Sequence, residues 1–171
     1  MKELLEKLSP YDILNNLLPG ILFVVLAQHT THYIFVQSDI ILGLFLYYFI
    51  GLVISRIGSL FVEWFLKKIK FVKYCEHKDF AKAQKQDKKI DMLLEINNMY
   101  RTFIAMGLLL LLLKLYEFCS LKFQFCETVT NVVLVVAILI LFLFSYRKQT
   151  QYVVKQVGYK LKDKENETSN I

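Results

Sequence analysis

The chain has 171 residues, of which 56% are apolar and 21% are charged, and its formal net charge is +6. Soluble domains are usually about 45–50% apolar, so this composition excludes an ordinary water-soluble globular domain. The length allows one compact unit, and lysine blocks beside apolar stretches are typical of membrane proteins. The sequence therefore predicts an all-α integral membrane protein, a four-helix bundle that forms one domain over residues 1–171.

The first predicted span covers about residues 10–28 and follows Ser9, a residue type that caps helices. Asn15 and Asn16 lie inside it, and Pro19 is expected to kink the helix because it frees the carbonyl of Asn15. Two interpretations of the amides stay open. They either bridge helices or line a polar constriction, or they are hydrated at the level of the lipid headgroups.

The second predicted span, residues 40–66, contains 27 residues. Such a helix measures about 40 Å, against a hydrocarbon core of about 30 Å, so it must tilt or protrude, and we expect protrusion. Arg56 and Glu63 are ionisable residues within this span, which makes them functional candidates. Both lie toward its inner end, where Arg56 can extend to the interface and Glu63 can pair with Lys67 at i+4.

Small residues recur along the second span at helical spacing, and they allow helix backbones to approach closely. One interpretation is an interface between copies of the chain, which could surround a pore. The other is packing against the first or third span. The residues concerned are Gly43, Gly51, Ser55, Gly58 and Ser59.

Residues 67–100 contain no proline or glycine. We therefore expect the second and third helices to extend into the cytoplasm as a basic hairpin of roughly 15–20 Å. Such a surface would dock an acidic partner protein or anionic lipid, although positive charge that only sets orientation explains it equally well. The absence of arginine argues against nucleic acid. The candidate docking residues are Lys67, Lys68, Lys70, Lys73, Lys78, Lys82, Lys85, Lys88 and Lys89.

The third and fourth spans are predicted at about residues 101–118 and 128–146. Cys119 and Cys126 lie in the short connection between them, where an oxidising compartment would favour a disulfide. A basic tail follows over residues 147–171, and its last residues are expected to be disordered.

Orientation follows from the distribution of Lys and Arg. The two connections assigned to the outside contain one basic residue, Lys122, whereas the 67–100 segment and the tail contain nine and six. Cytoplasmic loops carry the excess of Lys and Arg, so both termini and the 67–100 segment are predicted to lie inside.

No catalytic motif is present, so we expect neither an enzyme nor a cofactor. His29 and His32 have the spacing of two metal ligands on a helical turn, but no third ligand lies near them in sequence. A metal site is therefore not expected.

The segment from Ser9 to Gly20, SPYDILNNLLPG, resembles the start of small membrane proteins encoded in bacterial antiphage defence loci. These include the four-span membrane subunit of the Kiwa system and accessory membrane proteins of some CRISPR–Cas systems. The resemblance implies an oligomeric protein of the bacterial inner membrane, coupled to a cytosolic partner that senses infection or acts on it.

Two classes of function remain. The first is a non-enzymatic defence component, a membrane sensor or effector that forms homo-oligomers and docks its partner through residues 67–100. The alternative is a small secondary transporter or channel, in which Asn15 and Asn16 would serve a polar substrate, or a membrane anchor without transport.

The orientation can be tested with a reporter that is active only in the cytoplasm, fused after Phe80. We expect activity there, because the lysines flanking this position favour the inner side. A reporter at Phe80 that is exposed on the outer side would overturn the orientation.

Overall fold

A computed structural model describes residues 12–75, 77–87, 89–123 and 127–168. All regular elements in these ranges are helices, which confirms the all-α class, and four stretches are long and apolar enough to cross a membrane: Ile13–Thr30, Ile40–Lys68, Lys89–Lys122 and Thr128–Tyr159. The elements are η1 (Ile13–Leu17), α3 (Leu18–Thr30), α4 (Ile40–Ile57), η2 (Gly58–Val62), α5 (Glu63–Lys68), α6 (His77–Gln86), α7 (Lys89–Phe123) and α8 (Glu127–Thr168), where η marks a π-helix.

The interruption expected in the first span takes the form of a π-helical turn. Proline has no backbone N–H, so Pro19 cannot donate a hydrogen bond to the turn before it. The preceding turn, η1, widens instead, and the N–H of Leu18 donates to the carbonyl of Ile13, five residues earlier. Asn15 and Asn16 lie in this widened turn and are buried.

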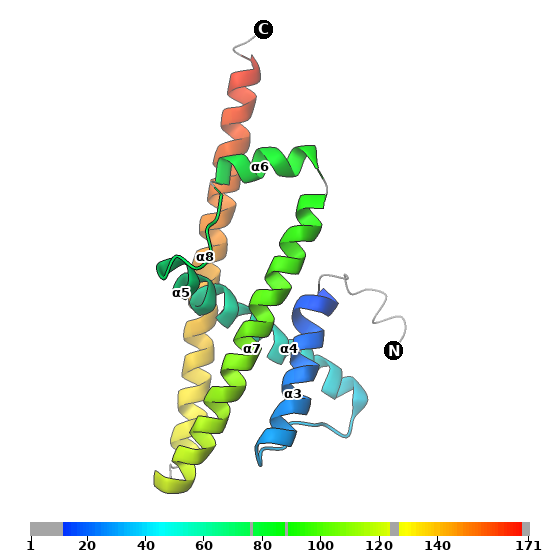
Figure 1. The fold of residues 1–171 in the computed structure, drawn as a ribbon, viewed down its shortest axis with the longest axis vertical. Helices are drawn as coiled ribbons and strands as arrows, with labels where there is room; N and C mark the ends of the chain where they lie inside the picture. The colour runs from blue at the N-terminus through cyan, green and yellow to red at the C-terminus, as the bar shows by residue number, and fades with distance from the viewer. Residues whose placement is uncertain (1–11, 76, 88, 124–126, 169–171) are drawn as a thin grey trace.

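The second span begins at Ile40, where the Asp39 carboxylate caps α4 by accepting the N–H groups of Ile41 and Leu42 at 2.8 and 3.1 Å. The helix continues through η2 and α5 and ends at Lys68. In Figure 1 this span crosses α7 obliquely.

The expected extension of the second helix into a cytoplasmic hairpin is wrong, because α5 ends in a Schellman-type cap. Lys70 adopts a left-handed conformation with φ of 58°, and its N–H donates to the carbonyl of Lys67. The N–H of Phe71 donates to the carbonyl of Leu66. These bonds satisfy the last carbonyls of the helix, and the chain leaves α5 without the glycine that usually occupies this position.

The expected extension of the third helix is present. Helix α7 runs without a break from Lys89 to Phe123, so the third span and residues 89–100 before it form one rod. Helix α8 also continues beyond its apolar part and remains helical to Thr168, where the sequence predicted a disordered end from residue 163 onward. The tail lacks proline and is rich in lysine and glutamate, which favour helix. The long rods are therefore α7 and α8, with α6 next to the start of α7 (Figure 1).

The closest packing lies where α4 crosses η1 and α3. A Cβ atom added to Gly51 would lie 1.7 Å from the carbonyl oxygen of Asn16, and one added to Gly20 would lie 1.8 Å from that of Tyr47. The two backbones are therefore in direct contact. The small buried core lies beside this crossing, where the second span packs on α7 through Ile54 and Ala105. Most large apolar side chains elsewhere face outward, as suits contact with lipid.

Substituting Gly51 with alanine tests this crossing. We expect Gly51→Ala to lower the free energy of unfolding by about 3 kcal/mol, because the new methyl group overlaps the Asn16 carbonyl and the helices must separate. The measurement is loss of helical circular dichroism during titration of the detergent-solubilised protein with dodecyl sulfate.

Gly107→Ala is the matched control, since no atom lies within 4 Å of the position its Cβ would take. It should leave stability unchanged or raise it by up to about 1 kcal/mol. Equal behaviour of the two variants would contradict the direct backbone contact.

Candidate functional site

The carboxylate of Glu63 contacts three cations from three helices. Its Oε1 lies 2.6 Å from Lys67 Nζ, and its Oε2 lies 3.0 Å from Arg101 Nη1 and 2.9 Å from Lys148 Nζ. The Glu63 side chain is only 11% exposed. We call Glu63, Lys67, Arg101 and Lys148 the Glu63 cluster. It joins α5, α7 and α8 through one carboxylate.

Lys148 fixes α8 against the second span by two further contacts. Its ammonium group donates to the backbone carbonyl of Ser59 at 2.6 Å and contacts Ser59 Oγ at 2.8 Å. With the bond to Glu63, these contacts use all three N–H groups of the lysine. Arg56 lies beside the cluster and lines a cavity together with Ser59 and Lys148.

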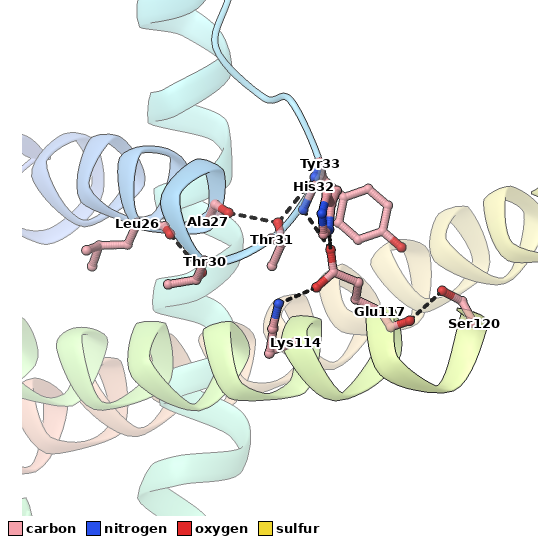
Figure 2. Close-up of polar contacts among 9 residues, drawn as sticks. All are labelled: Leu26, Ala27, Thr30, Thr31, His32, Tyr33, Lys114, Glu117 and Ser120. Atoms are coloured by element: carbon pink, nitrogen blue, oxygen red, sulfur yellow. Dashed lines mark hydrogen bonds and ion pairs between the residues drawn. The ribbon is translucent and has the colours of Figure 1, made fainter. Parts of the chain in front are cut away.

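A second group of charged residues lies at the opposite end of the third span, and Figure 2 shows its contacts. Oε1 of Glu117 accepts the backbone N–H of His32 at 2.6 Å and lies 2.8 Å from Nδ1 of the same residue. Oε2 accepts Lys114 Nζ at 2.6 Å. Glu117 is buried, so these bonds hold the segment after α3 against α7. We call these three residues the Glu117 cluster.

The turn after α3 directs His32 toward that carboxylate. Thr31 Oγ1 donates to the carbonyl of Ala27 at 2.7 Å and accepts the N–H of Tyr33 at 3.3 Å (Figure 2). The histidine that the sequence suggested as a weak metal candidate is therefore a partner of Glu117. No group of three or more His, Cys, Asp or Glu side chains suited to a metal ion occurs in the described ranges.

The buried amides lie at the α4 crossing. Asn15 and Asn16 are 1% and 6% exposed. Nδ2 of Asn16 donates to Oδ1 of Asp12 at 3.3 Å, and the hydroxyl of Tyr48 donates to the same oxygen at 3.3 Å. The burial of both amides argues against hydration at the headgroups, while the bond between the two helices is the one from Tyr48 to Asp12. Pro19 is buried just after the amides.

The small residues of the second span have contacts within the chain. Gly51 contacts the Asn16 backbone, Gly58 faces the backbone of Arg101, and Ser59 bonds to Lys148. Ser55 is buried, and the nearest atoms to a Cβ on Gly43 belong to the ring of Tyr47. These contacts correspond to the packing interpretation. Association of several copies stays a prediction.

The candidate docking lysines fall into three groups. Lys67 and Lys68 are already engaged, since their ammonium groups lie 4.1 Å from the Tyr74 ring and 4.9 Å from the Trp64 ring. Four others are exposed to solvent: Lys70, Lys73, Lys82 and Lys89. The remaining three lie outside the described residues or have side chains that the structure does not describe: Lys78, Lys85 and Lys88.

The apolar contact expected within the hairpin is absent from the described segment. In a hairpin of two packed helices Phe71 and Leu93 would be covered, but they are 77% and 60% exposed. The reason is the cap at Lys70, which turns the chain away from α7. Cys119 is a free cysteine in the structure, and Cys126 lies outside the described residues, so a disulfide between them stays a prediction.

Two residues of the Glu63 cluster were missed from the sequence. Arg101 begins the third predicted span, and Lys148 follows the fourth. The end of span two, the start of span three and the end of span four are predicted on the same side, so the charged residues there lie at one level. This was the signal that could have paired Arg101 and Lys148 with Glu63. The pair Glu63–Lys67 was expected from helical spacing and is present, and Lys114 and Glu117, three residues apart, form a second local pair.

We expect Glu63→Gln to lower the free energy of unfolding by about 3 kcal/mol, because it removes the only negative charge among three cations in a largely buried place. The measurement is dodecyl sulfate unfolding of the purified protein. Glu95→Gln, on the same side of the molecule but outside the cluster, is the control. If Glu63→Gln were as stable as the control, the cluster would not hold the helices together.

The chain matches no protein-family model, no curated protein and no solved structure. Its function must therefore be inferred from its own residues and contacts. Those contacts are the two charged clusters at either end of the third span and the buried polar contact where α4 crosses η1.

Proposed function

We propose that the chain is a non-enzymatic component of a bacterial defence system, located in the inner membrane, which couples a cytosolic partner to its membrane helices. The chain acts as a sensor or an effector and forms a homo-oligomer. In one form of this proposal the oligomer encloses a pore. The observation that carries the coupling is the continuity of α7, which contacts one carboxylate at each end of its apolar part, Glu63 through Arg101 and its own Glu117 near the other end.

The spacing of these carboxylate contacts suits a membrane. Arg101 and Glu117 are separated by 117 − 101 = 16 residues on α7. At a rise of 1.5 Å per residue their backbone positions lie about 24 Å apart. Long side chains that extend outward from these positions bring the distance between their charges closer to the thickness of a hydrocarbon core, about 30 Å. A force applied to one end of α7 therefore reaches both the Glu63 cluster and the Glu117 cluster.

The partner surface lies at the start of this rod. Helix α6 is joined to α7 by a bond of 2.6 Å from Gln84 Nε2 to Asp91 Oδ1. Lys82 on α6 and Lys89 on α7 are exposed beside it. Exposed lysines of this kind suit contact with an acidic protein partner. Binding there would move α7, and through Arg101 it would change the contacts of Glu63.

Association of several copies is supported by the outward apolar faces of the long helices. Leu143 and Phe144 on α8 are 68% and 55% exposed, as are many of their neighbours. In lipid these faces are free to contact either acyl chains or another copy. The proposal expects a stable multimer in mild detergent.

A second candidate is a small transporter or channel, which the buried amides of η1 favour. Polar side chains inside a span, on a π-helical turn, are frequent at functional sites. Flux of a polar solute through proteoliposomes, abolished by Asn15→Leu, would favour this candidate. A membrane anchor would show neither flux nor depolarisation.

The defence function is tested by phage plating on cells that express the chain together with its neighbouring genes. We expect the genes to lower plating efficiency at least about tenfold, and we expect the double variant Lys82→Glu, Lys89→Glu to abolish the effect. Charge reversal turns attraction to an acidic partner into repulsion.

Lys155→Glu is the control, because it reverses an exposed lysine that belongs to α8 and not to α6 or α7. It should retain protection at equal membrane abundance. Unchanged plating in the presence of the wild-type genes would overturn the defence function. Equal loss in the control would overturn the assignment of the partner surface to α6 and α7.

A further inference from the structure

A small cavity of about 100 Å³ lies between the second span and α8, next to the Glu63 cluster. Its polar lining comes from Arg56 and Ser59 on one side and from four residues of α8 on the other: Ser145, Lys148, Gln149 and Tyr152. We call it the Arg56 pocket. Its α8 residues recur at intervals of three or four, so they share one face of the helix.

The charge around the pocket is strongly positive. Lys148 shares the carboxylate of Glu63 with Lys67 and Arg101, so this cluster alone carries two more positive than negative charges. Arg56 adds another, and no ion pair of Arg56 occurs among the described residues. The region therefore has four cations and one carboxylate, a net charge of +3. The guanidinium group of Arg56 offers up to five N–H donors to a ligand.

A buried hydroxyl points to the same conclusion independently. Ser145 is 8% exposed, and its Oγ has no hydrogen-bond partner within the described part of the chain. Leaving a buried polar group unsatisfied is unfavourable, so a partner that the chain itself does not supply is expected there. Because Ser145 lines the pocket with Arg56, both groups are available to the same bound molecule.

We propose that the Arg56 pocket binds a phosphate group, carried either by the headgroup of an anionic phospholipid or by free phosphate. Arg56 donates to two phosphate oxygens, Ser145 donates its hydroxyl, and Lys148 contributes charge while it stays bonded to Glu63. The position suits a headgroup, since Trp64 and Lys68 stack nearby, as residues at a membrane interface do. Basic pockets between membrane helices are known to hold anionic headgroups.

Thermal unfolding of the full chain in a neutral detergent tests the proposal. Phosphatidylglycerol is added in one arm, and potassium phosphate in the other, against potassium chloride at equal ionic strength. We expect at least one of them to raise the unfolding temperature in a saturable way, because a ligand that binds the folded state stabilises it. A shift in the lipid arm alone assigns the pocket to a headgroup, and a shift in the phosphate arm shows that the free group suffices.

Three variants locate the effect. Arg56→Gln should raise the half-saturating ligand concentration about tenfold, since it removes a charged donor. Ser145→Ala should raise this concentration about threefold. It should leave the ligand-free unfolding temperature unchanged or higher, because an unsatisfied buried hydroxyl is lost. Arg147→Gln removes an exposed cation one residue from Lys148 that does not line the pocket, and it should bind as the wild type does.

Two results would overturn the proposal. One is the absence of any shift with both phosphatidylglycerol and phosphate, or an equal shift with zwitterionic phosphatidylcholine. The other is equal weakening by Arg56→Gln and Arg147→Gln, which would indicate attraction by overall charge in place of a site.

Discussion

The carboxylate of Glu63 is the constraint on which the arrangement of the helices depends. It is nearly buried and accepts bonds from cations on α5, α7 and α8. A carboxylate in this position is stable only while it is paired, and its three partners would repel one another without it. The end of α5, Arg101 of α7 and Lys148 of α8 are therefore held at one level. The position of α8, which has few other contacts with the rest of the chain, depends most on this interaction.

The second constraint is the direct backbone contact between α4 and η1. Gly51 and Gly20 allow the helices to touch, and the π-helical turn before Pro19 places the Asn16 carbonyl at the contact. A second π-helical turn, η2, begins at Gly58, where the second span faces the backbone of Arg101. Both widened turns therefore lie where close contact between helices is needed. In each case the irregular turn fits one helix to its neighbour.

The class of the fold could be predicted from the sequence because apolar stretches of this length are typical of membrane-spanning helices. The local ion pairs could also be predicted, since Glu63 and Lys67 are four residues apart and Lys114 and Glu117 three. Arg101 and Lys148 were missed as partners of Glu63 because that contact depends on how distant helices pack. The row of small residues indicated close contact correctly, but the pattern could not name Asn16 as the partner of Gly51.

The largest error concerned the segment after α5. The absence of proline and glycine predicts a continuous helix, yet Lys70 adopts the left-handed conformation that glycine usually takes. The cap is fixed by hydrogen bonds from the backbone N–H groups of Lys70 and Phe71. Backbone bonds of this kind cannot be recognised from the residue types. As a result of the cap, the exposed lysines of this region are divided: Lys70 and Lys73 follow α5, whereas Lys82 and Lys89 lie on α6 and α7.

A double-mutant cycle between Glu63 and Arg101 tests the central claim most directly. Dodecyl sulfate unfolding would be measured for the wild type, for Glu63→Gln, for Arg101→Gln and for the double variant. If the carboxylate couples α5 to α7, the double variant should lose less stability than the sum of the single variants, with a coupling of about 1–3 kcal/mol. Additive losses, within about 0.5 kcal/mol, would contradict the claim that this ion pair joins the helices.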